Sequence, residues 1–284
     1  MIYVRLMGGL GNQMFQYALA RRVAIDRRTK LTLDLSHFQN HSPGETIREY
    51  ELDCFNIGAS KVYKPVENHN SKRLLVFPTK PPQIYNEKAL AFDHSALKQP
   101  NNTLFIGYWQ NEKYFIKIQA QLRKDFRFIK HLSEPKKNIS DQIRNTQNSV
   151  ALQIRRGDYV TNKNSNQYHG LVPMEYYSKA VKKIAQSVKN PAFFVISDDH
   201  KWCEKNLNFG YPTIFVKHVP GTGQEDMNLM SQCKHQIIAN SSYGWWAAWL
   251  NKNPRKIIIA PKVWFKEKDA NNQIDIVPAD WLRI

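Results

Sequence analysis

The chain has 284 residues, 42% of them hydrophobic and 12% aromatic, which is enough for one large or two ordinary domains with a real core. That composition excludes a disordered or collagen-like chain, and no apolar run approaches the ~18 residues that cross a bilayer. The formal net charge is +17, from 41 Lys and Arg against 24 Asp and Glu. Such a surplus either favours an anionic partner or only keeps the surface solvated.

The cysteines and the N-terminus bear on the cellular compartment. Cys54, Cys203 and Cys233 are scattered and form no CxxC pair, metal-binding spacing or disulfide framework. Residues 1–6 lack the basic-then-apolar layout of a secretion signal. We therefore expect a soluble cytoplasmic protein.

Taken in chain order, the hydrophobic pattern predicts a strand over 2–6, a glycine turn, a helix with apolar residues at three-and-four spacing, and a strand over 31–35. Strand, turn, helix and strand are the opening of an α/β unit. Residues 40–100 are rich in proline and polar patches, so irregular structure with short helices is expected there.

The second half of the chain is more regular. Short buried strands alternate with short helices, which predicts a doubly wound parallel sheet whose ligands bind at the carboxyl ends of the strands. The polar stretch 131–149, within which Ile139 and Ile143 suggest a helix, is expected to join two domains, 1–140 and 150–284. The expected strands are 150–154, 192–196, 213–216, 236–239 and 256–260, and the expected helices begin at Pro173 or cover 201–207, 225–233 and 243–250.

Polar motifs follow several of these strands. The run from Gly8 to Gln13 is neither a Walker loop nor a dinucleotide fingerprint, so its glycines either admit an anionic ligand or only form a tight turn. Arg155 and Arg156 leave the strand over 150–154, where charged side chains are costly unless something pairs with them. Their forked donors match phosphate oxygens, and the alternative is an Arg–Asp ion pair that braces the turn.

Two further motifs end later strands. Ser197, Asp198 and Asp199 are expected to cap the next helix, orient the arginines or bind a metal, although no His or further acid stands at ligand spacing. Ser241 and Ser242 present hydroxyls and backbone N–H groups at a helix start, which makes a phosphate cradle without lysine or a simple helix cap. The tryptophans that follow are expected in the core.

Five motifs occur in the order of a known family. They are Gly8–Tyr17, Gly107–Gln110, Ile154–Tyr159, Phe194–Asp199 and Ile238–Trp246. With them the chain resembles bacterial α-1,2-fucosyltransferases of glycosyltransferase family eleven over nearly its whole length. The resemblance implies an α/β fold of the GT-B type, with two Rossmann-like domains that have parallel sheets and face a cleft. By this resemblance the N-terminal domain, 1–140, lies on the acceptor side and the C-terminal domain, 150–284, binds the donor. The resemblance also implies a GDP-fucose donor, no metal or other cofactor, and inversion at the anomeric carbon.

The same resemblance implies roles for the matching residues. Arg155 holds the donor diphosphate, Arg156 supports that site, and Asp226 recognises the guanine. Gln153 stands where the family has His; its amide still donates and accepts hydrogen bonds but takes no charge. Asn12, in the glycine-rich loop, faces the donor across the cleft. The complete predicted site comprises Arg155, Asp158 and Asn12 as catalytic residues and Gly11, Gln153, Arg156, Asp198, Asp199, Asp226, Ser241, Ser242 and Tyr243 as donor-binding residues.

We therefore expect an inverting transfer of L-fucose from GDP-fucose to the 2-hydroxyl of a galactose-type unit in an O-antigen, lipopolysaccharide or lipid-linked glycan. Asp158, Glu112 or a donor phosphate oxygen is expected to take the acceptor proton. The positive charge is expected to hold the enzyme loosely at the inner face of an anionic membrane, without a nucleic-acid partner. Alternatives are another linkage, another GDP-sugar, or a non-enzymatic basic protein that binds nucleic acid or glycan through its tryptophans.

Overall fold

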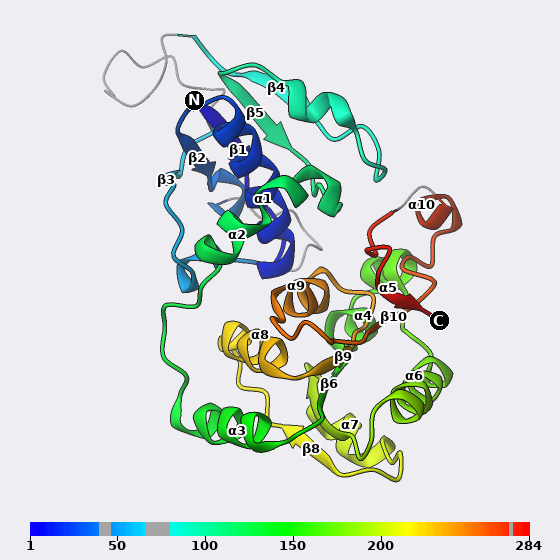
Figure 1. Ribbon diagram of the computed structural model, residues 1–284. Helices are drawn as coiled ribbons and strands as arrows, with labels where there is room; N and C mark the ends of the chain where they lie inside the picture. The colour runs from blue at the N-terminus through cyan, green and yellow to red at the C-terminus, as the bar shows by residue number, and fades with distance from the viewer. Residues whose placement is uncertain (40–46, 66–79, 273–274) are drawn as a thin grey trace. The chain divides into compact units, whose positions relative to one another are not determined.

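The computed structural model describes residues 1–39, 47–65, 80–272 and 275–284 (Figure 1). Two units divide the chain, and each has its own sheet. Unit 1 comprises Met1–Ile129 and Gln273–Ile276, and unit 2 comprises Lys130–Asn272 and Val277–Ile284.

Unit 1 is built on a parallel five-stranded sheet in the order β3-β2-β1-β5-β4. The central strand is buried, with Tyr3 and Val4 fully inaccessible, and the helix that follows it is buried along most of its length. The strands are β1 (Ile2–Arg5), β2 (Leu31–Asp34), β3 (Ser60–Val62), β4 (Gln83–Asn86) and β5 (Thr103–Ile106), and the α-helices are α1 (Leu10–Asp26) and α2 (Gln119–Asp125).

Unit 2 is built on a parallel six-stranded sheet in the order β11-β10-β9-β6-β7-β8. The strands are β6 (Ser149–Ile154), β7 (Ala192–Ser197), β8 (Thr213–Val216), β9 (His235–Ile237), β10 (Ile258–Ala260) and β11 (Leu282–Arg283). The helices are α3 (Glu134–Asn145), α4 (Gly157–Thr161), α5 (Lys163–His169), α6 (Met174–Ser187), α7 (His200–Asn206), α8 (Gly223–Gln232), α9 (Ser242–Leu250) and α10 (Lys268–Asn272).

The pattern of buried residues accounts for the strands and helices of unit 2. Every residue of β6 is buried, as expected for a strand of a parallel sheet that is covered on both faces. α6 buries one face, including Tyr177 and Ile184, whereas α9 is almost wholly apolar and buries Trp245 and Trp246 completely. The tryptophans expected in the core are therefore core residues.

Each sheet has a switch point, where the order of its strands changes direction. In unit 2 the chain runs from β6 outward through β7 and β8, then returns to the other side of β6 with β9. In unit 1 it runs from β1 through β2 and β3, crosses to the opposite edge with β4, and then places β5 on the other side of β1. Connections diverge at such a switch point, which leaves a crevice at the carboxyl ends of the two strands.

The expected α/β fold with two parallel sheets is confirmed. The irregular structure with short helices expected over 40–100 is confirmed by the 3₁₀ helices Leu52–Cys54 and His94–Lys98, and its residues 40–46 and 66–79 lie outside the described residues. It was wrong where β3 and β4 lie, because these edge strands are short and largely exposed. The polar stretch expected to join two domains contains α3, a helix of unit 2, because Lys136, Ser140 and Ile143 form its buried face.

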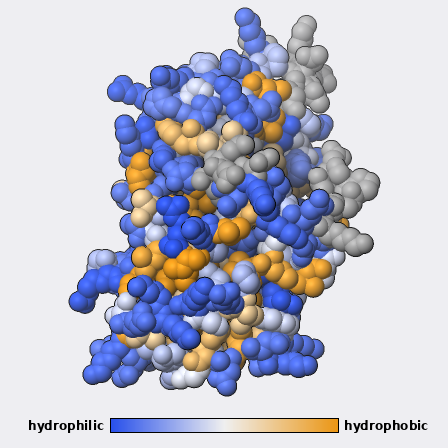
Figure 2. Space-filling view, turned by 90° about the vertical axis from the view of Figure 1, so that its right-hand side faces the viewer, coloured by the Kyte–Doolittle hydropathy of each residue, from blue (hydrophilic) through white to orange (hydrophobic). Residues whose placement is uncertain are grey.

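Polar residues dominate one face of the molecule. On the face drawn in Figure 2, hydrophilic residues cover most of the area and apolar residues interrupt them in several patches. Within the described ranges, no helix is both long and apolar enough to cross a membrane.

Candidate functional site

Two arginines and two aspartates meet at the carboxyl edge of the sheet in unit 2. β6 and β7 are neighbours and pair Ile154 with Ser197, so the residues that follow each strand lie side by side. Arg155 Nη1 lies 2.6 Å from Asp198 Oδ2, and Arg156 Nε donates to Asp199 Oδ2 at 3.1 Å. The alternative interpretation of the sequence, an Arg–Asp ion pair at this turn, is confirmed.

Further contacts fix the geometry of this cluster. Asp198 Oδ1 accepts the backbone N–H of Arg156 at 2.8 Å, and the Arg156 guanidinium lies 3.9 Å from the centre of the Trp202 ring. Asp199 is the N-cap of α7 and accepts from the Trp202 N–H at 3.3 Å. A Cβ at Gly157 would come within 2.6 Å of Asp198 Oδ2, so only glycine leaves room for this carboxylate.

The cluster can still serve an anionic ligand. The side chains of Arg155 and Arg156 remain 26% and 21% exposed, so neither is fully covered by its carboxylate partner. Asp198 and Asp199 therefore hold the arginines in place, which is one of the roles predicted for them.

The predicted base in this region has no described side chain. Asp158 lies in α4, and its side chain falls outside the described residues. The alternative base, Glu112, begins the 3₁₀ turn Glu112–Tyr114 of unit 1. The assignment of the base stays a prediction.

The turn after β9 lies on the other side of the switch point. Ser241 is the N-cap of α9 and is 9% exposed, but its side chain makes no capping hydrogen bond. Ser242 is the first residue of the helix, and Tyr243 Oη donates to the Gly223 carbonyl at 2.5 Å, which ties α9 to α8.

The Tyr159 hydroxyl donates to the Asn240 carbonyl at 3.2 Å, and the Arg155 guanidinium lies 5.6 Å from the centre of the Tyr159 ring. The turns after β6 and β9 are thus joined.

Gln153 has a structural contact in the same turn. Its side chain is buried, and Oε1 accepts the Ala239 N–H at 3.1 Å. A Cβ at Gly244 would come within 1.8 Å of that oxygen, so the carboxamide occupies the space where another side chain would project from α9. This contact ties β6 to the turn that follows β9, and the predicted place near the guanine stays a prediction.

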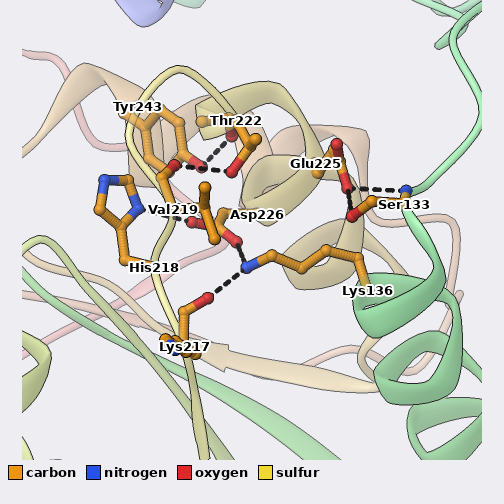
Figure 3. Close-up of polar contacts among 10 residues, drawn as sticks. Ser133, Lys136, Lys217, His218, Val219, Thr222, Glu225, Asp226 and Tyr243 are labelled. Atoms are coloured by element: carbon orange, nitrogen blue, oxygen red, sulfur yellow. Dashed lines mark hydrogen bonds and ion pairs between the residues drawn. The ribbon is translucent and has the colours of Figure 1, made fainter.

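Asp226 is the centre of a buried charge cluster that sequence analysis missed (Figure 3). It lies on α8 with 2% exposure, and Oδ1 is paired with Nζ of Lys136 from α3. Lys136 is also buried and donates to the Lys217 carbonyl at 2.7 Å. His218, just after β8, lies with Nδ1 2.9 Å from Asp226 Oδ2 and keeps its side chain 32% exposed. Both oxygens of the predicted guanine-binding acid are therefore engaged, and the histidine is the exposed member.

The glycine-rich loop of unit 1 forms a tight turn at the start of α1. Gly8 has φ +72°, and a Cβ there would come within 2.5 Å of Asn12 Nδ2. Asn12 Oδ1 accepts from Gln110 Nε2 at 2.8 Å, and Gly11 is buried inside the helix. Gln13, which was read only as part of the motif, donates to the Gly8 carbonyl at 2.8 Å and so fixes the turn.

Potential metal ligands do not cluster in the part of the chain that the structure describes. No group of three or more His, Cys, Asp or Glu there is placed to hold a metal ion.

The chain is similar in sequence to known proteins. The sequence model of Glycosyl transferase family 11 matches residues 84–284. The Escherichia coli protein named Alpha-1,2-colitosyltransferase is 38% identical over 301 residues, covering 100% of this chain and 98% of its own. The Escherichia coli O-antigen biosynthesis glycosyltransferase WbnK is 34% identical over 312 residues, and the match covers 100% of both chains.

A solved structure supports the fold. The NodZ α-1,6-fucosyltransferase soaked with GDP-fucose has a TM-score of 0.52 at 13% identity, covering 91% of this chain and 94% of its own. The chain therefore has the GT-B-like fold of fucosyltransferases.

Proposed function

The chain belongs to glycosyl transferase family 11, and we propose that it transfers L-fucose from GDP-fucose to the 2-hydroxyl of a galactose unit in a glycan. One observation carries this proposal: Arg155 and Arg156 follow β6 at the switch point of unit 2 and are held there by Asp198 and Asp199. Guanidinium groups are well suited to bind a diphosphate at such a point.

The proposed chemistry is a single displacement with inversion. The acceptor oxygen attacks the anomeric carbon as the bond from that carbon to the diphosphate breaks, and negative charge builds on the departing GDP. Arg155, aided by Ser241, Ser242 and the N–H groups at the start of α9, stabilises this charge because its geometry is fixed before the reaction. The acceptor proton passes to Asp158, Glu112 or a donor phosphate oxygen.

We propose that the guanine is read beside the Asp226 cluster. Asp226 keeps its predicted role through its neighbours: Lys136 neutralises it, and its second oxygen orients His218 toward the exposed side. A histidine ring offers one donor and one acceptor to a purine edge. Guanosine binding should therefore weaken when His218 is changed to Ala, as measured by calorimetry with GDP.

A second candidate donor is GDP-colitose. It is favoured by the 38% identical relative, whose printed name is Alpha-1,2-colitosyltransferase. Colitose is L-fucose without the 3-hydroxyl, so the two donors present the same diphosphate to the same arginines. The α-1,2 linkage in that name also supports the proposed position of transfer.

The test combines donor and linkage. Purified protein is incubated with GDP-fucose or GDP-colitose and galactose-terminated oligosaccharides, and the product linkage is assigned by NMR. A new α-1,2 linkage to galactose is expected, and the larger kcat/KM identifies the donor. Transfer from neither donor, or transfer to a different hydroxyl, contradicts the proposal.

We also propose that transfer needs no metal, because Arg155 and Arg156 supply the positive charge that a divalent cation otherwise supplies. Full activity is expected in EDTA. Restoration of lost activity by Mg²⁺ or Mn²⁺ would contradict this part of the proposal.

The net charge of +17 supports attachment to an anionic membrane, where lipid-linked glycans are built. Co-sedimentation with vesicles should rise with the fraction of anionic lipid and fall with salt. Binding that responds to neither would contradict attachment by charge.

A further inference from the structure

Residues Gly107–Gln110, the Tyr108 turn, lie at the switch point of unit 1. The turn follows β5, and β5 neighbours β1 where the strand order changes direction. Asn12 Oδ1 accepts from Gln110 Nε2 at 2.8 Å, so the turns after the two strands are joined. Gln16 joins them again, because Oε1 accepts the Met7 N–H at 3.0 Å and Nε2 donates to the Gly107 carbonyl at 3.1 Å.

The backbone of the Tyr108 turn is strained. Trp109 has φ +58°, which bulky residues rarely adopt, and Gly107 has φ +156°. A Cβ at position 107 would come within 2.3 Å of Glu87 Cβ, so this position requires glycine. Strained backbone persists only where the surroundings determine it and is concentrated at ligand sites.

Two sets of contacts hold the strain in place. Glu87 Oε2 accepts the Tyr108 N–H and Oε1 accepts the Trp109 N–H, each at 2.8 Å. The Trp109 side chain is fully buried, stacked on Tyr85 and edge-on to Phe105. The buried Trp109 side chain and the Glu87 carboxylate thus fix the backbone at Tyr108.

That residue carries an aromatic ring to the surface. Tyr108 is 39% exposed although the next residue is completely buried, and the joined amides of Asn12 and Gln110 belong to the same switch point. Galactose has one face of C–H groups, because its axial 4-hydroxyl projects from the other, and such a face stacks on an aromatic ring. Side-chain amides suit sugar hydroxyls, which both donate and accept hydrogen bonds.

We infer that Tyr108 is the stacking platform for the acceptor galactoside and that Glu87 is a positioning residue that holds it. The inference rests on the glycosyl transfer proposed above and adds the recognition of its acceptor. A neutral sugar fits the turn better than a diphosphate does, because the side chains that build the turn are amides, aromatic rings and a carboxylate.

The test uses two substitutions and a matched control in the full chain. Y108L removes the flat ring but keeps an apolar side chain, Y108F keeps the ring, and Y63L changes a tyrosine of unit 1 that follows β3 and is 55% exposed. The probes are methyl β-D-galactopyranoside and a β-galactosyl disaccharide. Initial rates give separate KM values for galactoside and GDP-sugar, and saturation-transfer NMR measures galactoside binding without transfer.

Y108L is expected to raise the galactoside KM about tenfold and to weaken the NMR effect equally, since one stacked ring contributes about that much. Y108F and Y63L should stay within about threefold of wild type, and the GDP-sugar KM should be unchanged in all three. Glu87→Gln, whose amide offers one acceptor oxygen instead of two, should raise the galactoside KM without changing GDP affinity.

The outcomes separate this inference from the proposed function. An unchanged galactoside KM and NMR effect in Y108L, or a raised GDP-sugar KM instead, overturns the platform. If wild type transfers neither sugar, the proposed function fails, and the NMR comparison of Y108L with Y108F still decides whether Tyr108 binds the galactoside.

Discussion

The two units use one strand-turn-helix plan and place different chemistry at its carboxyl edge. In unit 2, Arg155 and Arg156 leave the central strand and meet acids from the next strand. In unit 1, the central strand is followed by glycines and amides, and the acid at the neighbouring turn, Glu87, accepts from main-chain N–H groups rather than from a cation. Unit 1 has an ion pair between Arg5 and Asp34, but it joins two strands over a fully buried carboxylate.

The difference shows that topology selects the place and side chains select the ligand. Both sheets have a switch point where strand order changes direction, yet only the switch point of unit 2 carries paired arginines in the described part of the chain. Charge should therefore determine stability and activity in unit 2, whereas backbone geometry should matter most in unit 1. Substitutions in the two units test this contrast.

The largest effect is expected when the buried charge of unit 2 is left unpaired. Lys136→Met removes the cation beside Asp226, and an uncompensated buried charge costs about 3–5 kcal/mol in free energy of unfolding. Urea denaturation measures the loss. Lys137→Met is the control, because that side chain is 61% exposed and its pairing with Glu134 should contribute under about 1 kcal/mol. Equal losses in both variants would show that burial of the charge does not matter.

The next effect concerns catalysis in unit 2. Arg155→Ala should lower the rate of transfer by about 10²–10³, the usual cost of removing one preorganised donor to a developing negative charge. Circular dichroism should report an unchanged fold. Arg144→Ala, in the same unit and with a side chain 65% exposed, should keep wild-type activity. Near-native turnover of Arg155→Ala would remove Arg155 from the diphosphate site.

The third effect is a loss of stability that arises from a steric clash. Gly244→Ala places a methyl group against Gln153 in a buried turn and should destabilise unit 2 by about 1–3 kcal/mol. Gly58→Ala is the matched control, because a Cβ there meets nothing within 4 Å. Thermal denaturation gives both values. A neutral Gly244→Ala would mean that the glutamine side chain moves aside without cost.

The smallest effect concerns pH and unit 1. Burial raises the pKa of Glu87 above its ordinary value of 4.5, although two N–H donors oppose the shift. The native state then holds a proton that the unfolded state has lost, so this stabilisation is complete below the unfolded pKa and disappears as pH rises through the folded pKa. Between pH 4 and 7, wild type should therefore lose stability relative to Glu87→Gln. Parallel stability profiles in urea would contradict the shift.

Much of this arrangement could be predicted from the hydrophobic pattern of the sequence. The strands of unit 2 are continuous apolar runs, so their positions and the arginines at their ends were predictable. The partners of Asp226 were not, because Lys136 is 90 residues away in sequence and lies in the polar stretch that was expected to join two domains. The roles of Gln13 and Gln16 could not be predicted either, because their side chains form hydrogen bonds with main-chain atoms, and every residue has such atoms whatever its type.

The ion pair between Arg155 and Asp198 has a further consequence for ligand entry. Asp198 already acts as an internal counter-ion, so an incoming anion must share the Arg155 guanidinium with a resident carboxylate. That carboxylate weakens the attraction for any passing anion, because only a ligand with several well-placed oxygens gains enough from both arginines to offset the repulsion. The aspartate should thus favour a ligand with several oxygens, such as a diphosphate, over a single phosphate ion in the surrounding solution.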